Sequence, residues 1–220
     1  MKIYPIIVCF NPDVSNLNLL CKTLTNNHSA VIIVDNTENS YIAEYVAFPA
    51  CTLIPLGENT GIAHAQNIGI KQAIKGGADV IVFFDQDSKI ENDFLPLLLA
   101  PLKVGEPKVV APVFFDDPEG YEFPAMRLNK YGLLVKTYKR DRNIPYDVDV
   151  IISSGTAATA VTFNIAGFMD EDFFIDFVDT EWCLRCRNKN IPIQVCTYCR
   201  YEALGRCGIN KSWGYARVCS

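Results

Sequence analysis

Apolar residues in the first half of the chain gather in short unbroken runs, and the segments between these runs place apolar residues at helical spacing. A continuous run of Val, Ile and Phe is typical of a parallel strand that is buried on both faces. Strands are therefore predicted at residues 3–10, 30–35, 52–55 and 80–85. A helix is predicted at residues 62–75, and an earlier one has its apolar face on Leu17, Leu20, Cys21 and Leu24. The alternation of strand and helix predicts a doubly wound α/β sheet.

The second half of the chain keeps this pattern less regularly. A helix is predicted at residues 94–102, and short strands are predicted at residues 109–112 and 149–152. Residues 114–147 mix aromatic, charged, Pro and Gly residues without a clear period. A stretch of that length without periodicity is usually a functional loop region or a small subdomain. We therefore assign it to the binding of a second substrate.

The composition agrees with a globular protein and limits its partners. The 220 residues, of which 50% are hydrophobic, suit one α/β domain. The net charge is -5 and no block of Lys or Arg could follow a phosphate backbone, so nucleic acid is a poor candidate partner. The apolar segments are far shorter than the roughly 20 residues of a membrane-spanning helix, and the first residues begin a strand instead of a signal peptide. The protein is therefore expected to be cytoplasmic.

The nine cysteines are many for a chain of 220 residues. Cys9 and Cys21 fall in the first strand and the first helix, where a small buried hydrophobic residue is the usual explanation. The spacing Cys183-x2-Cys186 and Cys196-x2-Cys199 leaves a structural zinc site open as an alternative, although the gap between the pairs is short for a zinc ribbon. Without a secretory signal, no disulfide framework is expected.

Acidic residues end two of the predicted strands. Asp85 and Asp87 stand where the strand at residues 80–85 leaves the sheet, and Asp35 ends the strand at residues 30–35. Ligands of open α/β sheets bind outside the carboxyl ends of the strands, so Asp85 and Asp87 indicate a cation or a polyphosphate. Asp35 could accept a hydrogen bond from a ribose hydroxyl or from the imide N–H of uracil or thymine. An ordinary turn is the alternative at both places.

A glycine-containing loop precedes the helix at residues 62–75. Gly57 and Gly61 bracket this loop, and backbone N–H groups at the helix start suit an anionic diphosphate. The loop matches neither the dinucleotide-binding fingerprint nor the P-loop, so neither a dinucleotide nor phosphoryl transfer is indicated. His64 and Asn67 lie three residues apart and share one face of the helix.

Six carboxylates lie within residues 167–185, interleaved with aromatic residues. The dipole of a helix that starts here stabilises Asp179 and Glu181, but it does not explain Asp176. A carboxylate in partly apolar surroundings near a helix N-terminus is a candidate general base. Upstream, residues 153–156 combine small hydroxyl side chains with a glycine, which would allow the close approach of a ligand or form a plain turn.

Five stretches in this order along residues 3–195 resemble a bacterial family 2 glycosyltransferase of the GT-A fold, in particular the rhamnosyltransferases of O-antigen and capsule assembly. The stretches are Asp35-Asn36, Asn59-Thr-Gly-Ile-Ala-His-Ala-Gln-Asn-Ile-Gly-Ile70, Phe83-Phe-Asp-Gln-Asp-Ser88, Ser154-Gly155 and Phe174-Ile-Asp-Phe-Val-Asp-Thr-Glu-Trp-Cys-Leu-Arg185. The resemblance implies a single GT-A domain over residues 1–220. Its nucleotide-sugar half would cover residues 1–112 and its acceptor half residues 113–200. Residues 201–220 would form an atypical C-terminus that is truncated or divergent.

The resemblance implies an inverting transfer of rhamnose from dTDP-rhamnose to a hydroxyl of a lipid-linked glycan, with peripheral association at the inner face of the cell membrane. Transfer of glucose or galactose from a UDP sugar is the alternative. On the donor side, Asp35 would contact the pyrimidine, and the loop and helix with Asn59, Gly61 and Asn67 would cover the diphosphate. Asp85 would face the ribose or the metal.

The resemblance also implies a metal site and an acceptor site. Asp87 would bind Mg²⁺ or Mn²⁺, a cation that prefers oxygen ligands. Asp179 matches the catalytic carboxylate of the family and would take the proton of the acceptor hydroxyl. The acceptor side would comprise Asp176, Glu181, Trp182, Ser154 and Gly155, and Arg185 would pair with a carboxylate.

The resemblance weakens near the end of the chain. Members of the family often carry a histidine in a His-x-Leu-Gly run that completes the metal site, whereas this chain has Glu202 in Tyr201-Glu-Ala-Leu-Gly205. Glu is a competent oxygen ligand. Two outcomes are therefore open, a metal site completed by Glu202 and a catalytically impaired protein that binds nucleotide sugar without transferring it.

Overall fold

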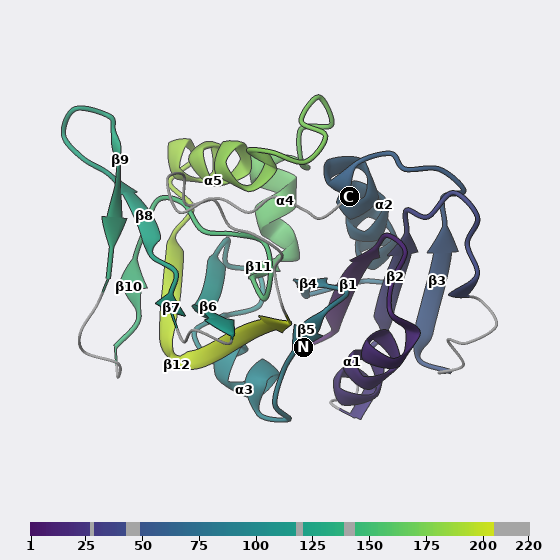
Figure 1. Ribbon diagram of the computed structural model, residues 1–220. Coiled ribbons are helices and arrows are strands. Elements are labelled where there is room, and N and C mark those ends of the chain that lie inside the picture. The colour runs from purple at the N-terminus through teal and green to yellow at the C-terminus, as the bar shows by residue number, and fades with distance from the viewer. Residues whose placement is uncertain (27–28, 43–48, 118–120, 139–143, 205–220) are drawn as a thin grey trace.

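The computed structural model describes residues 1–26, 29–42, 49–117, 121–138 and 144–204. At its centre these residues form a mixed sheet of ten strands, eight of which follow the order β10-β12-β6-β11-β4-β1-β2-β3. Helices cover both faces of the sheet (Figure 1). The predicted doubly wound α/β class is therefore confirmed.

The first half of the chain forms the parallel part of the sheet. Its elements are β1 (Ile3–Cys9), α1 (Val14–Asn26), β2 (Val31–Asp35), β3 (Cys51–Pro55), α2 (Ile62–Lys75) and β4 (Val80–Asp85). The four strands and α2 were predicted to within about two residues of their ends, and α1 was predicted by its apolar face alone. The strands pair in parallel in the order β4-β1-β2-β3, with Cys9 level with Asp35 and Val8 level with Asp85. Their carboxyl ends therefore meet at one edge of the sheet.

The second half extends the same sheet with shorter elements. They are β5 (Ser88–Lys89), α3 (Phe94–Leu99), β6 (Val109–Asp117), β7 (Tyr121–Glu122), β8 (Ala125–Leu128), β9 (Leu134–Thr137), β10 (Tyr146–Asp147), β11 (Ala157–Thr159), α4 (Ala160–Ala166), α5 (Val178–Asn188) and β12 (Ile193–Leu204). The antiparallel β11 lies between β4 and β6, and β8 and β9 form a separate hairpin. The region without periodicity is therefore a set of small strands, of which β7 and β10 join the main sheet while β8 and β9 form the hairpin.

The prediction of a strand at residues 149–152 is wrong. Val150 and Ile151 are buried, as their apolar character predicts, but this segment makes only an isolated bridge between Val150 and Met126 among the described residues. The strand that joins the sheet is β11, whose small residues Ala157 and Ala158 are fully buried between β4 and β6. Residues 150–151 are therefore buried although this segment does not pair as a strand of the sheet.

The core consists of two clusters, one on each face of the sheet. One cluster packs α2, α4 and α5 against the sheet and includes Ile6 and Trp182. The other packs α1 and α3 and includes Ile7 and Phe94. Neighbouring strand residues point to opposite faces, so Ile6 and Ile7 enter different clusters. Figure 1 shows α2, α4 and α5 above the sheet and α1 and α3 below it.

The cysteine pairs fall on opposite faces of the sheet. Cys183 and Cys186 of α5 are buried in one core cluster, whereas Cys196 and Cys199 of β12 are buried in the other. One tetrahedral zinc site needs all four sulfurs within about 2.3 Å of the metal. The alternative of a shared zinc site is therefore wrong, and these cysteines act as small buried side chains.

Within the described ranges, no helix combines the length and the apolar character needed to cross a membrane. The strand β12 ends at Leu204. The expectation of an atypical C-terminus at residues 201–220 therefore falls mostly on residues 205–220, which lie outside the described part of the chain.

Candidate active site

Asp35 and Asn36 follow β2 at the edge where the parallel strands end. Asp35 is fully buried, and its Oδ1 accepts a hydrogen bond of 3.1 Å from the backbone N–H of Thr37. Its Oδ2 is buried without a hydrogen-bond partner among the described residues. Because a buried acceptor without a partner is costly, this oxygen is suited to receive an N–H or O–H group of a ligand.

Asn36 fixes the glycine-containing loop before α2. Its side-chain Nδ2 donates to Asn59 Oδ1 at 3.1 Å and to the carbonyl of Gly61 at 3.2 Å, while its Oδ1 accepts from the N–H of Thr60 at 2.9 Å. The motif Asp35-Asn36 was noted in the sequence, but the sequence did not predict any role for Asn36. The structure places Asp35, Asn59 and Gly61 around one strand end, and their role on the donor side stays a prediction.

The N-terminus of α2 is in contact with the loop that precedes α5. The N–H of Ile62, one of the groups expected to face a diphosphate, donates instead to the carbonyl of Phe174 at 2.8 Å. Gly61 has a φ of 82°, and a Cβ atom there would lie 2.6 Å from both Cδ2 and the carbonyl oxygen of Phe174. A glycine is therefore required at this contact.

Asn67 holds the same loop at a second point. Its Nδ2 donates to the carbonyl of Met169 at 2.9 Å and to Oε1 of Glu171 at 2.7 Å, and its Oδ1 accepts from the N–H of Met169 at 2.9 Å. These contacts use both amide hydrogens of a side chain that is 2% exposed. The structure therefore gives Asn67 a positioning role, at odds with its predicted contact to the nucleotide.

His64 lies one helical turn before Asn67 and contacts the same carboxylate. Its Nδ1 is 2.7 Å from Oε2 of Glu171. The hydrogen bonds from His64, and then from Asn67, hold the pKa of Glu171 below its ordinary value. Residues 169–174 are thus tied to α2 by Met169, Glu171 and Phe174.

The turn after β4 carries the predicted metal-binding residues. Gln86 continues the sheet with its side chain, because its Oε1 accepts from the N–H of Phe10 at 2.7 Å and its Nε2 donates to the carbonyl of Phe10 at 3.1 Å. This fixes the turn between Asp85 and Asp87 against the end of β1. The role of Gln86 was not predicted from the sequence. Its side chain makes hydrogen bonds that a strand backbone would otherwise make, and such contacts do not appear in the pattern of apolar and polar residues.

Ser153 and Ser154 connect the two central carboxylates. The hydroxyl of Ser154 donates a short hydrogen bond to Oδ2 of Asp85, and the N–H of Ser153 donates to Oδ2 of Asp179 at 3.0 Å. Gly155 holds this turn against β4 with a hydrogen bond of 2.8 Å to the carbonyl of Phe83. Ser154 and Gly155 therefore position the carboxylates, in addition to any contact with an acceptor.

Gly155 is required by its surroundings. Its φ is 71°, and a Cβ atom at this position would lie 2.6 Å from Cδ2 of Tyr201. Glycine adopts a positive φ without steric cost and also allows this close approach. The Ser-Gly motif noted in the sequence is thus explained by local geometry as well as by its place in the site.

The three remaining acceptor-side predictions have different outcomes. Trp182 is a core residue, because it is buried, its Nε1 donates to the carbonyl of Gly167 at 2.9 Å and its ring stacks on Phe163. Glu181 pairs with Arg185, as predicted for Arg185, and this guanidinium also donates to the carbonyl of Ala166 at 3.0 Å. Both residues therefore stabilise the packing of α5 on α4. Asp176 is exposed and lies just before α5.

Strand pairing brings Glu202 to the turn that contains Asp87. Glu202 of β12 is paired with Lys89 of β5, two residues after Asp87. The described side chains of His, Cys, Asp and Glu include no group of three or more that could hold a metal ion. The backbone thus supports the juxtaposition of Asp87 and Glu202, and the metal site itself remains a prediction.

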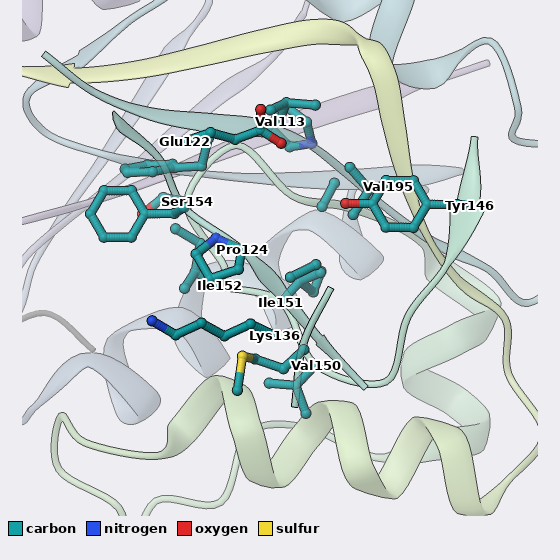
Figure 2. Close-up of a pocket in the computed structure, with 16 residues that line it drawn as sticks. Val113, Glu122, Pro124, Lys136, Tyr146, Val150, Ile151, Ile152, Ser154 and Val195 are labelled. Atoms are coloured by element: carbon teal, nitrogen blue, oxygen red, sulfur yellow. The ribbon is translucent and has the colours of Figure 1, made fainter. Parts of the chain in front are cut away.

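A cavity of about 100 Å³ opens on the side of Ser154 that faces the small strands. Figure 2 shows Ser154 and Pro124 on one side of the cavity in this view and Tyr146 on the other. Its walls are mostly apolar, and Glu122, Lys136 and Tyr146 supply polar groups. Burial, and then the charge of Glu122, raise the pKa of Tyr146, so its hydroxyl stays protonated at neutral pH.

The mixed α/β sheet with helices on both faces has the arrangement of the GT-A fold. Residues 6–175 match the profile of the family described as Glycosyl transferase family 2, and the chain belongs to this family. The predicted family is therefore confirmed.

Two curated proteins are similar in sequence. The chain is 42% identical over 195 residues to the dTDP-rhamnosyl transferase RfbF of Shigella flexneri, covering 88% of this chain and 66% of RfbF. It is 22% identical to the low-salt glycan biosynthesis hexosyltransferase Agl10 of Haloferax volcanii, covering 75% of this chain and 55% of Agl10. The chain therefore spans between half and two thirds of the length of these relatives.

Solved structures confirm the fold. GalNAc-T7, in a crystal structure with UDP, GalNAc and Mn²⁺, has a TM-score of 0.74 and 14% identity over 92% of this chain and 44% of its own. TarS of S. aureus has a TM-score of 0.67 and 15% identity over 94% of this chain and 37% of its own. At such low identity, the likeness concerns the fold alone.

Proposed function

We propose that this chain forms the catalytic part of an inverting rhamnosyltransferase. It would move rhamnose from dTDP-rhamnose to a hydroxyl of a lipid-linked glycan during the synthesis of a cell-surface polysaccharide. The observation that carries this proposal is the 42% identity to the dTDP-rhamnosyl transferase RfbF, which extends over 88% of the chain.

On the donor side, Asp35 is the proposed contact of the thymine base. The buried Oδ2 of Asp35 can accept the imide N–H of the ring. The loop of Asn59 and Gly61, which Asn36 fixes in place, would lie along the diphosphate. Uracil presents the same imide group, so this contact accepts UDP as well as dTDP.

Asp85 and Asp87 suit a divalent cation in their chemistry. They place carboxylate oxygens on one turn, and hard oxygen ligands are those that Mg²⁺ and Mn²⁺ prefer. We assign Asp87 as the metal ligand, with Glu202 as a second ligand from the adjacent strand and Asp85 beside them. A bound cation would neutralise the negative charge of the departing diphosphate.

Asp179 is the proposed general base. It would take the proton of the acceptor hydroxyl while that oxygen forms a bond to the anomeric carbon, and the bond from this carbon to the diphosphate oxygen breaks on the opposite side. The N–H of Ser153 holds Oδ2 of Asp179 in place.

The acceptor would enter from the side of the small strands. The cavity beside Ser154 offers apolar walls together with the polar groups of Glu122, Lys136 and Tyr146. A concave, mostly apolar site with a few polar groups is typical of a small-molecule site. The adjacency of this cavity to Ser154, which binds Asp85, supports its use by the acceptor.

Thermal unfolding with nucleotides tests the donor side directly. We expect dTDP with Mn²⁺ to raise the Tm of the protein, UDP to raise it less, and Asp87→Ala to abolish the part of the rise that depends on Mn²⁺. Glu106→Ala, which removes an exposed carboxylate paired with Lys103, serves as the control and keeps the full rise. If neither nucleotide shifts the Tm with or without Mn²⁺, the proposed function is wrong.

A further inference from the structure

The loop between α4 and α5 exposes an apolar tip. Phe174, Ile175 and Phe177 are 50%, 36% and 65% exposed. Figure 1 shows this loop projecting beyond the helices at the N-terminal end of α5. Large exposed apolar side chains that cluster in this way often mark a contact with a partner or ligand.

The backbone of Phe177 is strained. Its φ is 65°, in the left-handed region, and Phe177 is the residue that precedes α5. In the described part of the chain, the other non-glycine residues with a positive φ are Asn11 and Asn190. Asparagine tolerates this conformation, whereas a bulky aromatic residue in it is an outlier. Neither fold stability nor burial explains a phenylalanine here.

The loop is held firmly in this conformation. The carbonyl of Phe174 accepts from Ile62, and Glu171 contacts both His64 and Asn67, so α2 fixes the loop at two points. Phe177 also lies two residues before Asp179, whose position Ser153 fixes. The exposed ring is therefore part of a well-anchored segment between the proposed donor loop and the proposed base.

We propose that Phe177 binds the acceptor, packing its ring against the apolar face of the pyranose that receives the transferred sugar. This inference rests on the proposed function and adds an acceptor contact two residues before the proposed base, Asp179. The C–H groups on one face of a pyranose suit the negative face of an aromatic ring. The exposed carboxylate of Asp176, next in the chain, can accept hydrogen bonds from sugar hydroxyls.

The charge of the loop favours a sugar over a membrane surface. Asp170, Glu171, Asp172 and Asp176 lie within the same loop, and the whole chain has a net charge of -5. Anionic lipids attract basic segments and repel acidic ones. Neutral sugar hydroxyls, in contrast, are good partners for carboxylates.

Thermal unfolding of two reciprocal variants tests the strain. Phe177→Asn removes the ring and places a residue that tolerates a positive φ, so we expect its Tm to rise by about 2–4 °C. Asn190→Phe, at the exposed opposite end of α5, serves as the matched control and should lower the Tm by a similar amount. A fall in the Tm of Phe177→Asn would identify Phe177 as a packing residue and overturn the proposal.

Saturation-transfer NMR tests the contact in the presence of dTDP and diamagnetic Mg²⁺. The sugars are methyl α-L-rhamnopyranoside, methyl β-D-glucopyranoside and the methyl β-glycoside of N-acetyl-D-glucosamine. We expect the wild-type protein to bind at least one of these sugars, Phe177→Tyr to retain binding, and Phe177→Asn to bind at least fivefold more weakly. Absence of binding to the wild-type protein, or equal binding by Phe177→Asn, would overturn the proposal.

Two further measurements separate the possible failures. If vesicles of phosphatidylglycerol and phosphatidylethanolamine sediment with the wild-type protein but not with Phe177→Asn, the tip is a membrane contact and the proposal is wrong. The rise in the Tm of the wild-type protein with dTDP and Mn²⁺ tests the proposed function by itself. If that rise occurs while Phe177→Asn binds the sugars normally, only the role of Phe177 is refuted.

Discussion

Asp85 and Asp179 are held by two neighbouring residues of one turn. Ser154 donates its hydroxyl to Asp85, and Ser153 donates its backbone N–H to Asp179. One carboxylate ends β4 and the other lies in the first turn of α5, so elements far apart in the sequence meet at this turn. A displacement of the turn would therefore move Asp85 and Asp179 together.

The first prediction concerns the hydroxyl of Ser154. Ser154→Ala removes the hydrogen bond to Asp85 and leaves the backbone contact of Ser153 with Asp179 in place. A hydrogen bond to a charged group contributes about 1.5–3 kcal/mol, so kcat/KM for dTDP-rhamnose should fall roughly 10- to 100-fold. Steady-state kinetics provides the measurement, with Ser15→Ala on the exposed face of α1 as the control. An unchanged kcat/KM would show that Asp85 needs no such support.

The second prediction separates binding from catalysis at Asp179. Asp179→Asn keeps an oxygen that can accept from the N–H of Ser153 but removes the ability to take a proton. Turnover should fall about 10²- to 10⁴-fold, the usual contribution of general base catalysis. The rise in Tm with dTDP should persist. If the wild-type protein binds dTDP but neither transfers nor hydrolyses dTDP-rhamnose, the chain is a nucleotide-sugar-binding protein without catalysis.

The parallel half of the fold could be predicted because its signals are local. Residues 80–84 form an unbroken apolar run and are all buried, and Gly61 and Gly76 mark both ends of α2. The short strand β11 escaped prediction, since its small residues resemble a loop. Residues 150–152 have the stronger strand signal, yet Val150 and Ile151 are buried without a place in the sheet.

The site could be predicted only as far as residue types reveal it. Carboxylates at strand ends indicated Asp35, Asp85 and Asp87, because parallel strands end at one edge. The contacts of Asn67 and Trp182 join segments that are distant in sequence, and no spacing shows whether such a side chain faces a ligand or the core. The roles of these two residues can be assigned only from the contacts in the structure, and not from the periodicity of the sequence.

The third prediction compares two glycines of one loop. Gly57 and Gly61 both have a positive φ, but only a Cβ at Gly61 would collide with Phe174, since the space at Gly57 is open. Gly61→Ala should lower the free energy of unfolding by about 2–5 kcal/mol, and Gly57→Ala by about 1–2 kcal/mol. Urea denaturation measures both values. Equal losses would mean that the loop at Phe174 moves away without cost.

The last prediction concerns the dependence of stability on pH at the contact between α2 and Glu171. Hydrogen bonds from His64 and Asn67 lower the pKa of Glu171 in the folded protein. A carboxylate with a lowered pKa stabilises the fold above its unfolded pKa, and this contribution disappears as the pH falls through the folded pKa. Glu171→Gln should therefore lower the Tm at pH 7, and this difference in Tm should shrink as the pH falls below the ordinary pKa of 4.5 and through the lower folded pKa.

His64 and Glu171 are both more than one third exposed, so the loss in the free energy of unfolding at pH 7 should stay within about 1 kcal/mol. Calorimetry from pH 3 to pH 8 measures it, with Glu106→Gln as the control. If the difference in Tm between the wild-type protein and Glu171→Gln grows as the pH falls, the pKa of Glu171 is raised in the folded protein instead of lowered.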